Sequence, residues 1–260
     1  SDSEIKFSFK NKTDSGLEVG MAVEMDTDVA GYDETNMYIK GGFGTLLLGS
    51  QDGAGDKFAI DAEDVVSEEI QATGTDTLSL SDTDLETTGD ANKITYHVPA
   101  MGGLKAGISY TDNGTNSTTG DQDSIEIGAQ YTIDAGGASI TLGGATRNTE
   151  QVSGTVDKES SNVGVSITSG NITAKIAQAT YEATNADEEA NGVGVKFKIS
   201  DAMSLGAYTV KVEDSTGTTD EEYTNTGAEV TYAIASGLTA YFNISDYDYK
   251  TGAGTGAGTT

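Results

Sequence analysis

Residues 52–92 read DGAGDKFAIDAEDVVSEEIQATGTDTLSLSDTDLETTGDAN and form the longest stretch of the chain without strand alternation. They contain twelve acidic residues and a single base, Lys57. A segment of this length without secondary structure, inside a compact domain, is usually a functional loop or is disordered. Because short strands are expected on both sides of it, we expect the loop to fold into the middle of a β-barrel and narrow the opening. A mobile acidic surface loop is the alternative that this stretch alone leaves open.

The rest of the sequence predicts fourteen β-strands. Residues 4–12, EIKFSFKNK, show the pattern: apolar and polar residues alternate with a period of two, as in a strand with one apolar face. The tail at 251–260, TGAGTGAGTT, shows no strand pattern. The predicted strands span residues 4–12, 17–25, 35–41, 45–51, 93–99, 104–112, 123–133, 138–147, 162–168, 172–182, 192–199, 203–213, 225–234 and 238–247.

The gaps between these strands alternate strictly between short turns and long loops. Short turns on one rim and long loops on the other are typical of an outer-membrane barrel. The polar side of the strands is rich in small residues, namely Gly20, Gly107, Gly128, Gly164, Gly194, Gly206 and Gly227. A soluble sandwich would need bulky residues packed between two sheets. The pattern therefore favours an all-β, transmembrane, antiparallel up-and-down barrel with its apolar side towards lipid and a watery lumen.

The direction of the strands predicts a barrel larger than the fourteen strands. If the long loops are extracellular, strand 4–12 runs inward and strand 238–247 runs outward. An open edge in lipid leaves unmet backbone groups, each costing several kcal/mol. We therefore expect sixteen strands in the complete barrel, and residues 1–260 to be one domain that lacks a strand at each end.

Composition excludes several function classes. The formal charge is −28, from 42 acids against 14 bases, which disfavours nucleic acid as a partner. His97 is the only histidine and no cysteine occurs, so we expect no catalytic site and no enzyme activity. No Asp-x-Asp-x-Asp-Gly spacing occurs, and we expect neither a cofactor nor a dedicated metal site. Carboxylates of the acidic external loops could still bind Ca²⁺.

Three segments carry a resemblance to a known family: DSEIKFSFKNKTDSGLEVGMAVEMD (2–26), GGFGTLLLGSQ (41–51) and NKITYHVPAMGGLKAGISYTD (92–112). The sequence resembles the sixteen-stranded, trimeric general-diffusion porins of Gram-negative bacteria. The resemblance implies an outer-membrane channel for passive diffusion of ions and small hydrophilic solutes. It also implies a homotrimer, joined roughly through residues 4–51, in contact with outer-membrane lipid and lipopolysaccharide. Outward Thr35 and Thr45 suit such a contact. The alternative is an acidic β-rich surface-layer or adhesive protein, but the chain lacks the repeats or the bulky residues on both strand faces that it would need.

The resemblance also assigns a role to residues 52–92, as the third external loop that folds inward and constricts the pore. Such constrictions usually set several arginines against the acidic loop, whereas this chain has only one arginine, and Ser50 stands where such porins often carry another. The expected constriction consists of the loop acids Asp61, Glu63, Asp64, Glu68 and Glu69 and the opposing bases Lys6, Lys10, Lys40 and Arg147.

Spacing within the loop predicts a local helix. Ala62, Val66 and Ile70 recur every four residues, so we expect a short helical turn in 61–71 with its apolar face against the barrel wall. The remaining external loops are also rich in acids, and their field should concentrate cations. We therefore expect a mild cation preference, opposed by the lumen lysines.

Overall fold

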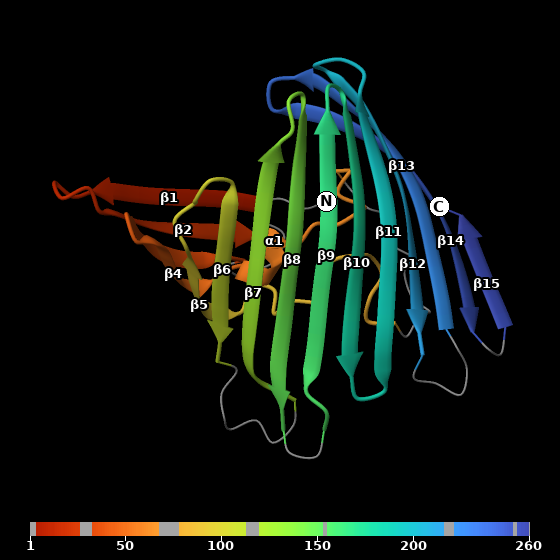
Figure 1. Cartoon of the computed structure of the whole chain (residues 1–260), viewed down its shortest axis with the longest axis horizontal. Helices are drawn as coiled ribbons and strands as arrows, with labels where there is room; N and C mark the ends of the chain where they lie inside the picture. The colour runs from red at the N-terminus through yellow and green to blue at the C-terminus, as the bar shows by residue number, and fades with distance from the viewer. Residues whose placement is uncertain are drawn as a thin grey trace.

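The computed structural model describes residues 4–26, 33–67, 78–112, 120–152, 155–215, 221–251 and 254–259. They form one antiparallel sheet of fifteen strands, in which each strand pairs with its neighbours in chain order (Figure 1). The strands are β1 (Glu4–Lys12), β2 (Glu18–Asp26), β3 (Thr35–Gly41), β4 (Gly44–Ser50), β5 (Asn92–His97), β6 (Leu104–Thr111), β7 (Asp121–Asp134), β8 (Ala138–Gln151), β9 (Lys158–Ser169), β10 (Ile172–Ala183), β11 (Ala186–Lys198), β12 (Met203–Asp214), β13 (Glu221–Ala235), β14 (Leu238–Thr251) and β15 (Gly254–Thr259). One helix, α1 (Ala54–Phe58), lies in the long loop between β4 and β5.

All fourteen predicted strands are present, but several are longer than predicted: β8 continues to Gln151 and β9 begins at Lys158, so much of the predicted gap at 148–161 is strand. Two further expectations are wrong. The tail forms β15, which pairs with β14, although its Thr and Gly residues give no apolar alternation. The predicted loop at 183–191 is mostly strand, because β10 and β11 are joined by a turn of only Thr184 and Asn185. Asn185 has a φ of 67°, and asparagine tolerates this left-handed conformation in tight hairpin turns.

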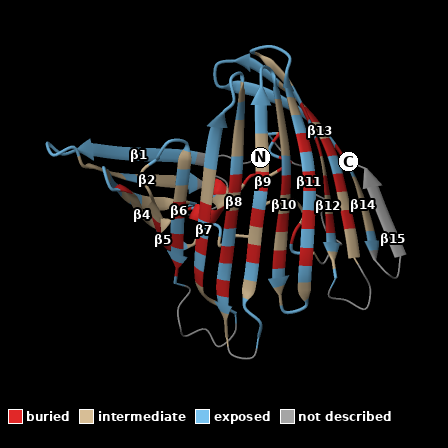
Figure 2. Cartoon of the chain, in the orientation of Figure 1, coloured by how far each residue is buried: buried red, intermediate tan, exposed pale blue. Residues whose placement is uncertain are grey.

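The apolar side of the sheet faces outward. Ile125, Ile127, Leu142, Val195 and Phe242 are between 44% and 72% exposed. Figure 2 shows buried and exposed residues alternating along β7 to β12. One sheet that exposes its apolar side cannot be a sandwich that buries it, and the predicted barrel class is confirmed. In the part of the chain that the structure describes, no helix is long and apolar enough to cross a membrane.

The sheet curves around the long loop but does not close. Its two edges are β1 and β15, and the described residues of these strands do not pair with each other. The expected closed barrel of sixteen strands is thus represented here by fifteen strands in an open sheet. Helix α1 contacts β5, β6, β7 and β8, and it lies against the concave side of the sheet (Figure 1).

A row of inner-face glycines makes room for the loop. We call it the glycine track, and its members come from β6 to β12: Gly107, Gly128, Gly143, Gly164, Gly192, Gly194 and Gly206. A Cβ added at Gly164 would lie 2.6 Å from the carbonyl oxygen of Ile60, and one at Gly128 would lie 2.9 Å from the Cβ of Phe58. Side chains at these positions would overlap the loop, so the glycines allow its backbone to lie directly on the wall.

The glycine track can be tested with a pair of substitutions in neighbouring strands. Gly164→Ala should loosen the loop, because overpacking costs about 1–3 kcal/mol and would speed cleavage of the loop by a glutamate-specific protease about tenfold. Gly144→Ala is the matched control, since its added Cβ would meet nothing closer than the Asn162 carbonyl oxygen at 3.6 Å. Equal cleavage rates for both variants and the unmodified chain would show that the loop does not rest in the track.

Candidate functional site

The first arm of the loop, residues 53–67, crosses the inner wall from β6 to β13. Its backbone N–H groups donate to wall side chains at three points. These bonds run from Ala54 N to Ser109 Oγ (2.7 Å), from Ile60 N to Asn162 Oδ1 (3.1 Å) and from Ser67 N to both carboxylate oxygens of Glu229 (3.0 and 3.1 Å). The first arm is therefore fixed at both ends and in the middle.

The second arm, residues 78–92, returns along the same wall. Its anchors are again backbone N–H groups bound by wall oxygens. These bonds run from Ser79 N and Leu80 N to Glu188 (2.9 and 2.7 Å), from Glu86 N to Ser160 Oγ (3.1 Å) and from Thr88 N to Glu126 Oε1 (3.2 Å). Hydrogen bonds to an ionised carboxylate are about twice as strong as those between neutral groups. Wall carboxylates on β7, β11 and β13 thus hold both arms.

Glu63 ties the two arms to each other. Its carboxylate accepts hydrogen bonds from Thr83 N (3.1 Å) and Thr83 Oγ1 (2.8 Å), and Thr83 Oγ1 is also 2.8 Å from Ala62 N, which donates to it. The Asn162 side chain donates to the carbonyl oxygens of Ile60 and Thr83, one from each arm. The two arms of the loop are therefore hydrogen-bonded to each other as well as to the wall.

Apolar packing adds to these bonds at the far end of the loop. Val65 from the first arm and Leu80 from the second are buried against β10 to β13. The wall residues of this cluster are Ala179, Tyr181, Ala190, Tyr208, Val210, Val212 and Tyr223. Burying a Val or Leu side chain is worth about 1.5–3 kcal/mol, so the cluster holds the two arms without using any charge.

The predicted acids of the constriction have different positions. Asp64 is exposed and pairs with Lys175 on β10, Nζ to Oδ2 2.7 Å. Asp61 is half-buried and accepts a hydrogen bond from Asn162 Nδ2 at 3.2 Å. Glu63 is only 6% exposed and lies between the arms, so it holds the loop together and does not face the opening. Glu68 and Glu69 lie outside the described residues.

The predicted helical turn is wrong for the part of 61–71 that the structure describes. Residues 61–67 contain only a turn, closed by a 3.0 Å bond from Val66 N to the Glu63 carbonyl oxygen. The helix is α1, earlier in the loop. Ala62 and Val65, rather than Ala62 and Val66, are the fully buried pair. Both lie against the glycine track, Ala62 at Gly192 and Val65 at Gly194.

The predicted bases lie in two places: Lys6, Lys10 and Lys40 are on β1 and β3, whereas Arg147 is on β8. Lys6 pairs with Glu24 and, at 3.4 Å, with Glu34. Lys10 and Lys40 are exposed on β1 and β3, and neither has an ion pair within 4.0 Å among the described residues. Arg147 is buried beneath the loop, where Nη1 donates to the Thr87 carbonyl oxygen and lies 3.7 Å from Glu86 Oε1.

Arg147 therefore stands on the wall that carries the loop, not on the opposite wall. Two loop acids among the described residues, Glu86 and Asp64, form ion pairs with this wall, through Arg147 on β8 and Lys175 on β10. The anchoring residues Glu126, Asn162, Glu188 and Glu229 are absent from the sequence prediction. By strand alternation these four residues occupy ordinary water-facing positions. The available signal was that Glu126, Glu188 and Glu229 are acids in strands whose inner face is rich in glycine.

Crowding of carboxylates changes the acidity of the loop. Burial, followed by the charge of Asp82, raises the pKa of Glu63 to about 7. Burial and Asp52 raise the pKa of Asp56 to about 6. Burial and the neighbouring Asp84 hold the pKa of Asp61 far above its usual value. The loop thus carries less charge near neutral pH than its acid count suggests.

Comparison with known proteins places this geometry among channels. The family model described as Gram-negative porin matches residues 1–252. No curated protein is similar enough to this chain to match it. Solved structures with the same fold include an anion-selective porin from Comamonas acidovorans, with 16% identity and a TM-score of 0.69 over 100% of this chain and 84% of that one.

Two further structures agree. A mutant of the Rh. blastica porin has 18% identity and a TM-score of 0.66, covering 97% of this chain and 86% of that one. The trimer form of OmpT, an outer membrane protein of Vibrio cholerae, has 16% identity and a TM-score of 0.64, covering 100% of this chain and 87% of that one. At these identities the likeness concerns the fold.

The raised pKa values predict how loop packing depends on pH. Glu63 binds its proton more tightly in the folded chain, with its pKa raised from 4.5 to about 7, so the folded state holds more protons between these values. Packing of the loop should then weaken as pH rises from about 4.5 to about 7. Protease cleavage of the loop, measured across this range, should accelerate with pH, and Glu63→Gln should reduce the dependence, leaving the part due to Asp56 and Asp61. A loop that becomes better protected as pH rises would contradict the assignment.

Proposed function

Because the chain belongs to the Gram-negative porin family and is an outer-membrane channel rather than an enzyme, we propose that residues 52–92 form the constriction of its water-filled pore. The observation that carries the proposal is the path of the loop, which crosses the concave wall from β6 to β13 and returns. A loop held inside the curve of the sheet reduces the area open to solutes. Ions and small hydrophilic solutes would pass by diffusion.

Single-channel conductance tests the constriction. Deleting residues 61–71 should raise the conductance of the channel in a planar bilayer, because it removes the turn that lies on the glycine track. Deleting residues 153–156 from an external loop is the control and should leave conductance near its original value. Unchanged conductance after the first deletion would mean that the loop does not limit the pore.

We further propose that the constriction favours cations. The described part of the loop carries nine acids and one base, and among them Asp64 and Glu86 reach the solvent. The bases closest to these two, Lys175 and Arg147, are already paired with them. Charges that line a narrow opening set ion preference, so the net field near the loop should attract cations. The Comamonas relative, described as anion-selective, shares the fold only.

Reversal potentials in a KCl gradient test this preference. Asp64→Asn leaves Lys175 unpaired and should reduce the ratio of cation to anion permeability between about 1.4-fold and 5-fold, the equivalent of about 0.2–1 kcal/mol for an exposed charge pair. Asp201→Asn, in the turn after β11, removes the same charge away from the loop and should have no effect. The preference should fade between about 0.1 M and 1 M salt as the Debye length falls from about 10 Å to 3 Å. Anion preference of the unmodified channel would refute the proposal.

A homotrimer is the assembly that we propose, with β1 to β4 as the contact and outer-membrane lipid and lipopolysaccharide around the remaining outer face. Thr45 does not belong to this contact, because it pairs with the inner-face residue Lys40. The outer face of these strands instead exposes Phe7, Phe9 and Met37, which suits an apolar interface. The trimer form of the Vibrio protein is a precedent within the fold.

Size in mild detergent tests the assembly. The protein should elute with the mass of three chains, and Phe7→Lys together with Phe9→Lys should shift it to one chain. Ile125→Lys with Ile127→Lys, on the outer face of β7, is the matched control and should leave three chains associated. A single chain before any substitution would contradict the trimer.

A further inference from the structure

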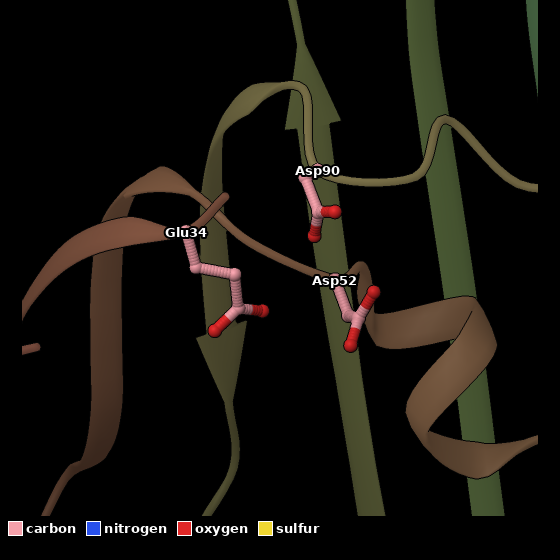
Figure 3. A group of neighbouring side chains, drawn as sticks. All are labelled: Glu34, Asp52 and Asp90. Carbon is pink, nitrogen blue, oxygen red and sulfur yellow. The ribbon is translucent and has the colours of Figure 1, made fainter. Parts of the chain in front are cut away.

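Three carboxylates converge near the two ends of the loop, where the chain leaves β4 and enters β5 (Figure 3). Glu34 precedes β3, Asp52 lies at the start of the loop and Asp90 near its end. One carboxylate oxygen from each lies within 4.8 Å of the other two. Ca²⁺ holds its oxygen ligands at about 2.3–2.6 Å, so two ligands of one ion are at most about 5 Å apart. The three side chains are thus already within the span of one cation.

The backbone around them is held in place by Ser50. Its hydroxyl donates to the carbonyl oxygen of Asp33 at 3.3 Å and to that of Asp90. This hydroxyl joins the segment before β3 to the end of the loop. The carboxylates of Glu34 and Asp90 therefore approach each other because their main chains are linked.

A buried amide next to the carboxylates points independently to a ligand. Gln51 is only 4% exposed, and neither its Oε1 nor its Nε2 has a hydrogen-bond partner. Its side chain lines a cavity of about 320 Å³ together with Glu34 and Asp52. Buried side-chain amides are normally bonded, so an amide oxygen left without a partner beside two carboxylates is suited to a metal ion.

Few positively charged side chains balance the three carboxylates. Lys6 lies 3.4 Å from Glu34 Oε2 but also pairs with Glu24. Lys93 donates to the carbonyl oxygen of Gly89. Among the described residues, Lys6 is the only base within 4.0 Å of any of the three carboxylates, so their negative charges face one another at close range. A divalent ion would relieve this repulsion.

We propose that Glu34, Asp52 and Asp90 bind one Ca²⁺ ion, with Gln51 Oε1 as a fourth protein ligand and water in the remaining positions. Mixed carboxylate and amide oxygens without a strict geometry suit Ca²⁺ better than Mg²⁺, which requires a near-ideal octahedron and retains more water. The ion joins both ends of the loop to the segment before β3. It acts on the base of the loop and is independent of whether the loop limits conductance.

Calorimetric titration of CaCl₂ into the full chain, in detergent after removal of metal with EDTA, tests the site. We expect one saturable site. Asp52→Asn with Asp90→Asn should weaken Ca²⁺ binding on the order of tenfold or more, and Gln51→Leu by a smaller factor. Asp134→Asn with Asp201→Asn is the matched control, because it removes the same charge from the opposite rim, at the end of β7 and in the turn after β11, and it should bind Ca²⁺ as the unmodified chain does.

Two results would overturn the site. One is the absence of saturable binding, and the other is an equal loss in the control, which would mean diffuse attraction to an acidic protein. Circular dichroism checks that each variant folds. If the double variant does not fold, Gln51→Leu decides: Ca²⁺ binding at its original strength would remove Gln51 from the site and with it the proposal. In the unmodified chain, Ca²⁺ should also slow protease cleavage of the loop, and Mg²⁺ should do so less.

Discussion

A chain that enters the lumen must satisfy its backbone N–H groups there, and this requirement organises the inner wall. The loop has too little regular structure to bond its own amides, since α1 is its only helix among the described residues. The wall supplies the acceptors, and half of the anchoring side chains are carboxylates. Glu126 binds the amide of Thr88, Glu188 those of Ser79 and Leu80, and Glu229 that of Ser67. An unpaired buried amide would cost about as much as a lost hydrogen bond, so these acids stabilise the loop although they share its sign of charge.

This use of acids divides the charge of the channel into two kinds. Glu63, Glu126 and Glu229 are nearly inaccessible and act through hydrogen bonds. Asp64 and Glu86 are open to solvent, and in the proposed function their field would act on passing ions. A count of acidic residues therefore overstates the field at the opening. The glycine track has the complementary effect, because it brings the loop so close to the wall that wall acids become anchors instead of pore charges.

The fold was largely predictable from local pattern, and the site only in part. Alternation of apolar residues places Phe242 and Ile127 outward because a strand has a period of two. The position of the long loop follows from its length and from the absence of strand alternation in residues 52–92. Contacts between distant segments have no such local signal: Asn162 bonds to Ile60 across 102 residues, and Arg147 lies under the loop that it was expected to face. Helical spacing at Ala62 misled because contact with the wall, rather than local propensity, sets the conformation there.

The distance along the chain between the loop and its last anchor determines the order in which the channel can assemble. Ser67 is held by Glu229, which is 162 residues later, and Ser79 by Glu188, which is 109 residues later. Contacts of such long range form only after the intervening hairpins have brought their ends together. The loop is therefore fixed against the wall only after the sheet through β13 has formed, and the space inside the curved sheet is open before the loop occupies it.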